Sequence, residues 1–145
     1  MRRIISHRGN LNGPSHDENT KLAVDRAISF DLDVEIDVWS VDGILYLGHD
    51  APSEMISIDF LQKRSEKLWI HAKNYEALLA LSRVSSLNVF FHNLDAYTIT
   101  THGNIWAYPT SYISGSENVK VVFGKEIQIG EWSVCTDFPL AYLND

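Results

Sequence analysis

The sequence predicts an α/β fold, a reduced (β/α) TIM-type barrel in which several second-half helices are replaced by loops. Short apolar stretches with strand character alternate with helical patterns, which favours a largely parallel sheet. Polar, titratable residues recur where the predicted strands end, as they do at the active-site face of such a barrel. The chain has 145 residues, against about 250 for a full barrel, and we expect it to form one domain over residues 1–145.

Strand patterns and helix caps place the elements in order. We expect helices to begin after Asn19, Ser57 and Asn74, because Asn and Ser are preferred N-cap residues. An Asp42-Gly43 turn predicts that the second strand folds back on itself. The predicted strands are 3–7, 33–39 with its return 44–47, 67–71, 88–92, 104–108, 119–123 and 132–136, and the predicted helices are 20–30, 58–65 and 75–84. After Val84 the strands follow one another too closely for a helix after each one.

Composition excludes several classes of function. The net charge of −7 argues against nucleic-acid binding, which needs a basic face. A single cysteine, Cys135, excludes an internal disulfide framework and a thiolate zinc cluster. The apolar run after Arg2 and Arg3 is too short for a signal peptide, and no stretch could span a membrane, so we expect a cytoplasmic protein without membrane insertion.

The stretch "VEIDVWSVDGILYLGHD", residues 34–50, contains an unusual strand. Alternation places Glu35 and Asp37 on one face, where two like charges repel unless something compensates them. Trp39 points to the same face and is a candidate wall of a substrate site. The hairpin then brings His49 back towards these carboxylates, and we expect the carboxylates to face inward and share a cation.

Several motifs together resemble the glycerophosphodiester phosphodiesterase family, within the phosphatidylinositol phospholipase C-like superfamily. The matching stretches are "SHRGN" with its His-Arg pair, "ENT" before the first helix, the Glu-x-Asp strand with the histidine after its hairpin, and the closing "CTDFP". The resemblance is clear over residues 4–50 and weaker at 68–74 and 134–139. It implies a barrel, a bound divalent cation and hydrolysis of phosphodiesters.

Chemistry at the matching positions is consistent with that activity. Glu35 and Asp37 offer hard oxygen ligands suited to Mg²⁺ or Ca²⁺. His7 and His49 are suited to proton transfer at neutral pH, and the resemblance implies a general base and a general acid. Arg8 supplies a guanidinium that matches phosphate geometry. The resemblance also implies that a substrate hydroxyl attacks first, giving a cyclic phosphate that water then opens.

Further candidates complete the predicted site. Lys73 could add a point charge to phosphate binding, and His92 could line the pocket after the fourth strand. The resemblance implies a place for Glu18 near the metal. It also places His71, in "WIHAKN", where the family has a third metal carboxylate. Because imidazole suits Mn²⁺ or Zn²⁺ better than Ca²⁺, His71 leaves the identity of the metal open.

We therefore predict a metal-dependent phosphodiester hydrolase acting on glycerophosphodiesters or similar small alcohol–phosphate diesters. A phosphodiester-linked glycan is a variant of this substrate class, and a lyase that stops at the cyclic phosphate is a variant of the reaction. The alternative from another class is a catalytically weakened phosphoester- or sugar-phosphate-binding protein. The expected partner is the small substrate, and the helix-free faces of a reduced barrel leave room for a homodimer.

Overall fold

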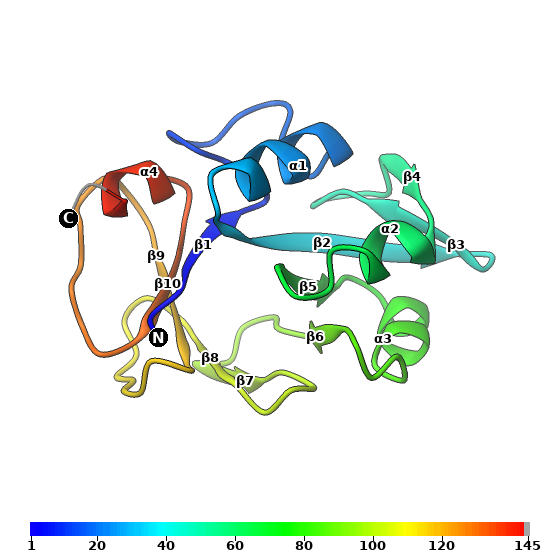
Figure 1. The fold of residues 1–145 in the computed structure, drawn as a ribbon. Coiled ribbons are helices and arrows are strands. Elements are labelled where there is room, and N and C mark those ends of the chain that lie inside the picture. The colour runs from blue at the N-terminus through cyan, green and yellow to red at the C-terminus, as the bar shows by residue number, and fades with distance from the viewer. Residues whose placement is uncertain (144–145) are drawn as a thin grey trace.

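The computed structural model describes residues 1–143, in which ten strands form one sheet and four helices lie outside it (Figure 1). The elements are β1 (Ile4–His7), α1 (Lys21–Ser29), β2 (Asp33–Val41), β3 (Ile44–Leu47), β4 (Glu54–Ile56), α2 (Ile58–Gln62), β5 (Leu68–Ala72), α3 (Tyr75–Leu81), β6 (Asn88–Phe90), β7 (Tyr97–Ile99), β8 (Ile105–Ala107), β9 (Val119–Val122), β10 (Ser133–Thr136) and α4 (Pro139–Tyr142). The predicted α/β class is therefore confirmed. No helix in this described part is long and apolar enough to cross a membrane.

Seven strands run parallel in the order β6-β5-β2-β1-β10-β9-β8. β1 lies between β2 and β10, so the first and last strands of the chain are neighbours, with Ile5 opposite Cys135. β7 is antiparallel to β8, and β3 and β4 extend the carboxyl half of β2 as an antiparallel meander. The carboxyl ends of the parallel strands consequently meet at one end of the sheet.

The sheet is not closed, so the expectation of a closed barrel is wrong. Among the described residues β6 pairs only with β5, and β7 only with β8. Isolated hydrogen bonds join β6 to the chain around β7: Thr101 N–H donates to the Val89 carbonyl at 2.8 Å, and Thr98 Oγ1 donates to the Phe91 carbonyl at 2.9 Å. These contacts do not extend into a ladder between β6 and β7. We call this junction the seam.

The three helices that the sequence predicts, all before β6, are present as α1, α2 and α3. Ser57 and Asn74 accept the capping bonds of α2 and α3 as predicted, but Thr20, not Asn19, caps α1. No helix lies between β6 and β10 in the described chain, which confirms the predicted loops. The sequence pattern missed β4, β7 and α4, which have only three or four residues each.

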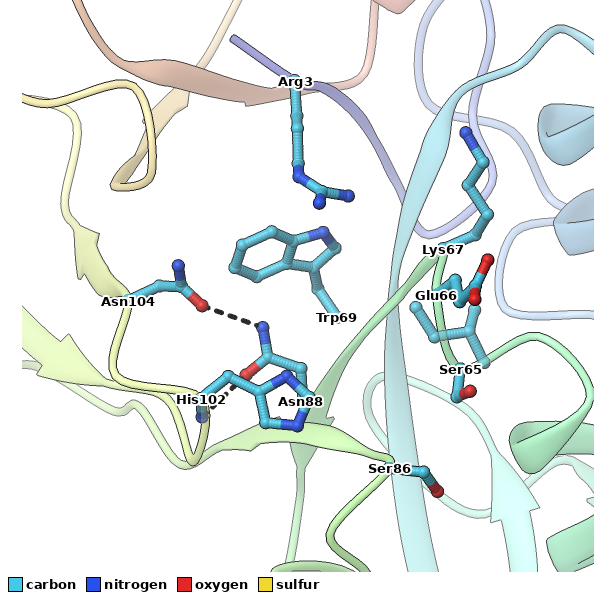
Figure 2. A pocket seen from close by; sticks show the side chains of 10 residues that line it. Arg3, Ser65, Glu66, Lys67, Trp69, Ser86, Asn88, His102 and Asn104 are labelled. Atoms are coloured by element: carbon cyan, nitrogen blue, oxygen red, sulfur yellow. Dashed lines mark hydrogen bonds between the residues drawn. The ribbon is translucent and has the colours of Figure 1, made fainter. Parts of the chain in front are cut away.

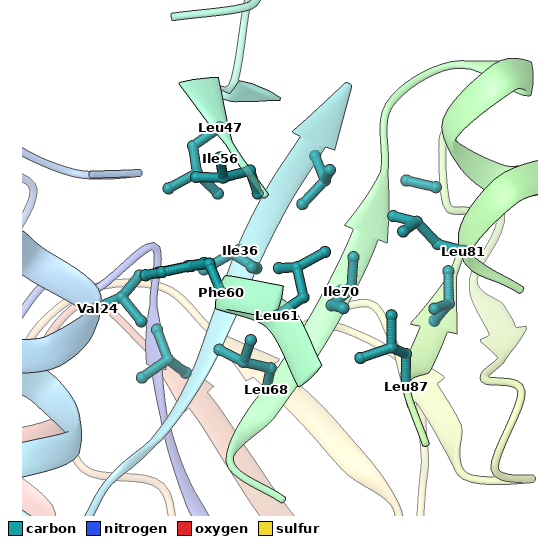
Figure 3. Packing of buried hydrophobic residues seen from close by; sticks show 14 of the residues in the cluster. Val24, Ile36, Leu47, Ile56, Phe60, Leu61, Leu68, Ile70, Leu81 and Leu87 are labelled. Carbon is teal, nitrogen blue, oxygen red and sulfur yellow. The ribbon is translucent and has the colours of Figure 1, made fainter. Parts of the chain in front are cut away.

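The main apolar core lies between the sheet and its helices. In Figure 3, Phe60 and Leu61 of α2 lie over Ile36 of β2 and Ile70 of β5. A separate cluster includes Trp69, Phe90 and Trp106 with Val119 and Cys135, on strands β5 to β10. The stacked rings of Phe90 and Trp106, 4.5 Å apart, pack across the seam and link the ends of the open sheet.

A hollow of about 600 Å³ lies at the amino ends of the strands, opposite the end where the motifs predict chemistry (Figure 2). Its polar groups largely satisfy one another. Asn88 donates to Asn104 at 3.1 Å, and the His102 backbone donates to Asn88 at 3.3 Å (Figure 2). Arg3 forms a 2.7 Å ion pair with Asp33. The hydrogen bonds around this hollow therefore connect the amino ends of β6 and β8.

We predict that Leu61→Ala lowers the free energy of unfolding by about 2–5 kcal/mol, because Leu61 is 0% exposed in the main core. Urea denaturation measures the change. Leu22→Ala is the matched control, since Leu22 is 71% exposed on α1 and should cost less than about 0.5 kcal/mol. Equal losses in the two variants would contradict this description of the core.

Candidate active site

The register of three parallel strands assembles the centre of the site. His7 on β1 lies opposite Glu35 on β2, and Asp37 on β2 lies opposite His71 on β5. Glu35 and Asp37 are 2% and 1% exposed, so both predicted carboxylates are buried on the same face of the sheet. One oxygen of each and a nitrogen of His71 lie within 4.8 Å of one another, a spacing that can hold a metal ion.

The two carboxylates have oxygens that the protein leaves unsatisfied. Glu35 Oε2 and Asp37 Oδ1 are buried and accept no hydrogen bond within the described chain. An unpaired buried charge is costly, and a bound cation would remove the cost. The donor set therefore fits a divalent cation.

Burial and the neighbouring charge of Asp37 raise the pKa of Glu35 to about 7. Burial acts in the same direction on Asp37, but its contacts with His71, Asn19 and Lys73 outweigh it and lower the pKa of Asp37 to about 2. Near neutral pH, when no cation is bound, Asp37 is therefore ionised and Glu35 is close to the midpoint of its titration.

His71 is held in the orientation that a metal ligand needs. Its Nε2 lies 2.9 Å from the His92 carbonyl oxygen, closer than the His92 N–H at 3.4 Å, which assigns the proton to Nε2. Its Nδ1 faces Asp37 Oδ1 at 3.1 Å and Glu35 Oε1 at 3.9 Å. The ring stacks on Phe90 at 5.0 Å. In the neutral ring, the form that binds a metal, the Nδ1 lone pair thus points at two carboxylate oxygens, and the carbonyl partner is typical of metal-binding histidines. When the ring is protonated, Nδ1 instead donates to Asp37, and this is the contact that lowers the pKa of Asp37.

Each of the two predicted acid–base histidines has an aspartate on Nδ1. His7 Nδ1 contacts Asp137 at 2.8 Å, and His49 Nδ1 contacts Asp50 at 2.7 Å. This pairing places the proton on Nδ1 in the neutral ring and leaves a lone pair on Nε2, which in His7 lies 3.8 Å from Glu35 Oε2. Burial tends to lower the pKa of His7, but the Asp137 hydrogen bond and the charge of Glu35 outweigh it and raise that pKa.

Arg8 is fixed by both its backbone and its guanidinium. Its φ of 56° is left-handed, and its N–H donates to the Glu35 carbonyl at 2.8 Å. Its Nη1 donates to Glu18 at 3.0 Å and its Nε lies 3.3 Å from Asp37. Gly9 follows with φ of 80°, where a Cβ would lie 2.8 Å from the Ala23 backbone. The chain after β1 therefore packs tightly on α1.

Asn19 clamps Asp37 through two hydrogen bonds, whereas the sequence pattern predicts only a helix cap at this position. Its Nδ2 donates to Asp37 Oδ2 and its Oδ1 accepts from the Asp37 backbone, both at 2.9 Å. Asn10 is a second missed residue, donating to Glu18 and to Asp137 at 2.9 and 2.8 Å. Buried amides in this loop, just before α1, thus connect the ends of β1, β2 and β10.

A cavity of about 180 Å³ brings together many of the predicted residues. It is lined by His7, Arg8, Glu35, Asp37, His49, His71 and His92, with Phe90, Asn93, Trp106, Tyr108, Val121 and Phe123. The aromatic part of this lining was not predicted as site. Strand alternation and position at a strand end could have indicated these aromatic residues. However, apolar residues at such positions are equally typical of any protein core, so the pattern does not distinguish a site from a core.

Three predicted residues lie beside the cavity rather than in its lining. Lys73 Nζ lies 3.6 Å from Asp37 Oδ1. Trp39 donates from Nε1 to the Gly48 carbonyl at 2.6 Å and so supports the segment that carries His49. Glu18 contacts Arg8 and Asn10 and is outside the three-residue metal cluster, so its ligand role stays a prediction.

Comparison with known proteins gives a likeness of fold. No protein-family model matches the chain, and no curated protein matches it. Among solved structures it is similar to a glycerophosphodiester phosphodiesterase from Agrobacterium tumefaciens, with a TM-score of 0.57 over 98% of this chain and 99% of that chain. The two chains share one fold. At 16% identity the likeness establishes the fold, and it agrees with the family resemblance of the motifs.

We predict that Glu35→Gln stabilises the metal-free protein relative to wild type, by an amount that grows as the pH rises. A folded-state pKa raised from 4.5 to about 7 gives the wild type stability that is present below pH 4.5 and lost as the pH rises through about 7. The amide side chain in Glu35→Gln does not ionise, so this variant does not lose stability in that way. Urea denaturation in EDTA between pH 4.5 and 8.5 measures the difference.

The exposed carboxyl of Glu66 provides the control, and the difference between Glu66→Gln and wild type should change little over this range. If the difference in unfolding free energy between Glu35→Gln and wild type is flat or shrinks with rising pH, the pKa of Glu35 is not raised by burial.

Proposed function

We propose that the protein is a metal-dependent phosphodiester hydrolase acting on glycerophosphodiesters or similar small alcohol–phosphate diesters. The observation that carries the proposal is the placing of two unsatisfied buried carboxylates and two Asp-paired histidines around one cavity. The motif resemblance and the shared fold support the same reaction class.

Glu35, Asp37 and His71 would hold the cation. A bound divalent cation would neutralise the non-bridging phosphate oxygens. Two carboxylates suit Mg²⁺ or Ca²⁺, whereas the imidazole nitrogen shifts the preference towards Mn²⁺ or Zn²⁺. We propose that His71 makes this a mixed nitrogen–oxygen site that prefers Mn²⁺ to Ca²⁺.

The other residues of the cavity move protons and orient the phosphate. Nε2 of His7 and Nε2 of His49 would exchange protons with the attacking hydroxyl and the leaving alcohol, their roles reversing when water opens a cyclic phosphate. The Arg8 guanidinium, held by Glu18 and Asp37, would face the phosphate oxygens in a fixed orientation.

A panel of glycerophosphodiesters with Mg²⁺, Ca²⁺, Mn²⁺, Zn²⁺ or EDTA tests this function. We expect metal-dependent release of alcohol and phosphomonoester, reduced about 10²–10⁴-fold in His7→Ala and in His49→Ala. His102→Ala, at the hollow on the opposite end of the sheet, is the control and should retain activity. No turnover together with a metal-dependent melting shift would favour the binding-protein alternative, and accumulation of cyclic phosphate would indicate a lyase.

Metal selectivity tests His71 separately from turnover. We predict that the rise in Tm with Mn²⁺ exceeds the rise with Ca²⁺ at equal concentration, because a ligand that binds only the folded state stabilises it more the more tightly it binds, with a logarithmic dependence on affinity. In His71→Glu the order should reverse, since a third carboxylate suits Ca²⁺. An unchanged metal order in this variant would exclude His71 as a ligand.

A further inference from the structure

Asn10 lies behind the phosphate-binding and acid–base residues, outside the lining of the cavity. It is 0% exposed and belongs to the loop that follows β1. Two hydrogen bonds of its main chain fix it there: its N–H donates to the His7 carbonyl at 3.0 Å, and its own carbonyl accepts from Ser6 Oγ at 2.6 Å. The backbone therefore holds this side chain in one place at the carboxyl end of β1.

The Asn10 amide donates to two carboxylates. Its Nδ2 lies 2.9 Å from Glu18 Oε2 and 2.8 Å from Asp137 Oδ1. An amide nitrogen carries two protons, so both donors of this side chain are used on acidic residues. The two acidic residues are far apart in the sequence, because Glu18 is 8 residues from Asn10 and Asp137 is 127 residues from it. One buried NH₂ group thus joins the loop before α1 to the end of β10.

The acceptor of the same amide has no partner. Asn10 Oδ1 is buried and accepts no hydrogen bond within residues 1–143. A buried acceptor without a donor is costly, and native proteins contain few of them. Turning the amide over would place Oδ1 against two carboxylates, so the observed orientation is the one that serves Glu18 and Asp137. The protein therefore leaves one acceptor unsatisfied in order to hold these two carboxylates.

Each of the two carboxylates holds one functional side chain. Asp137 Oδ1, the oxygen that accepts from Asn10, also lies 2.8 Å from His7 Nδ1. Glu18 Oε1 accepts from Arg8 Nη1 at 3.0 Å. A carboxylate that is bonded on two sides cannot rotate without breaking both bonds. The orientations of His7 and Arg8 are therefore linked through Asn10.

We propose that Asn10 is a positioning residue that orients His7 and Arg8 together, so that proton transfer and phosphate binding depend on one buried amide. This inference rests on the proposed hydrolase function. Without Asn10, Asp137 is free to turn away from His7, and the direction of His7 Nε2 is no longer fixed. Arg8 keeps a second contact, from its Nε to Asp37 at 3.3 Å, so it depends on Asn10 less than His7 does.

Kinetics of Asn10→Ala, with a glycerophosphodiester and the activating metal, test the proposal. We expect kcat to fall about 10–100-fold, the range found when residues that orient metal ligands are removed, and KM to rise by a smaller factor. Asn88→Ala is the matched control, because Asn88 is another buried asparagine, bonded to Asn104 and to the His102 backbone at the opposite end of the sheet.

The control variant should have a lower Tm but the kcat and KM of the wild type. Wild-type kcat in Asn10→Ala overturns the proposal, and so does an equal loss of kcat in Asn88→Ala, since that loss would follow from lower stability alone.

Nuclear magnetic resonance tests the same arrangement without turnover. The Asn10 amide protons and the His7 Nδ1 proton share one Asp137 oxygen, so the metal-free wild type should show a nuclear Overhauser effect between them. The signal of the hydrogen-bonded His7 Nδ1 proton should weaken or disappear in Asn10→Ala and persist in Asn88→Ala. Absence of the Overhauser effect in the wild type overturns the positioning role, even where Asn10→Ala does not fold, and an unchanged His7 signal in folded Asn10→Ala overturns it as well.

The two proposals fail in different measurements. A wild type that hydrolyses no phosphodiester with any metal counts against the hydrolase function. The resonance experiment then decides separately whether Asn10 orients His7.

Discussion

Two carboxylates buried side by side on β2 are the constraint around which the rest of the site is arranged. Left alone, Glu35 and Asp37 would repel each other in a region with little water. Asp37 is compensated by the amide of Asn19 and by nearby Lys73, and one oxygen remains for His71. Glu35 has only the more distant His7 and His71, at 3.8 and 3.9 Å, and these do not outweigh the effect of its burial and of Asp37 on its pKa. One carboxylate of the candidate cation site is therefore ionised, and the other is close to its ionisation midpoint near neutral pH.

The sequence predicted those parts of the molecule that depend on local pattern. Alternation along β2 placed both carboxylates on one face, and the Asp42-Gly43 turn defined the hairpin that ends beside His49. Partners distant in sequence were not predictable, because nothing near His7 indicates that Asp137, 130 residues later, will hold its ring. The role of Asn19 was hidden, since an asparagine before a helix also suits a cap. Closure of the sheet depends on whether β6 and β7 pair at the seam, and such pairing between separate segments is poorly specified by local residue pattern.

The two halves of the sheet differ in what surrounds their strands. In the first half, α1, α2 and α3 cover the outer face and fix the strands whose ends carry charge. In the second half, loops replace helices, and aromatic side chains such as Phe90 and Trp106 fill the space inside the sheet. A short chain can therefore retain a rigid charged centre while its opposite wall consists of loops, whose length and composition can vary with little effect on the core.

The pairing of β1 with β10 has a consequence for folding. One edge of β1 and the Nδ1 partner of His7 both come from residues 133–137, and His7 and Asp137 are 130 residues apart in the chain. Until those residues join the sheet, β1 presents an unpaired edge, the kind of surface that promotes association between chains. Docking of β10 therefore protects that edge and brings Asp137 to His7 in the same event.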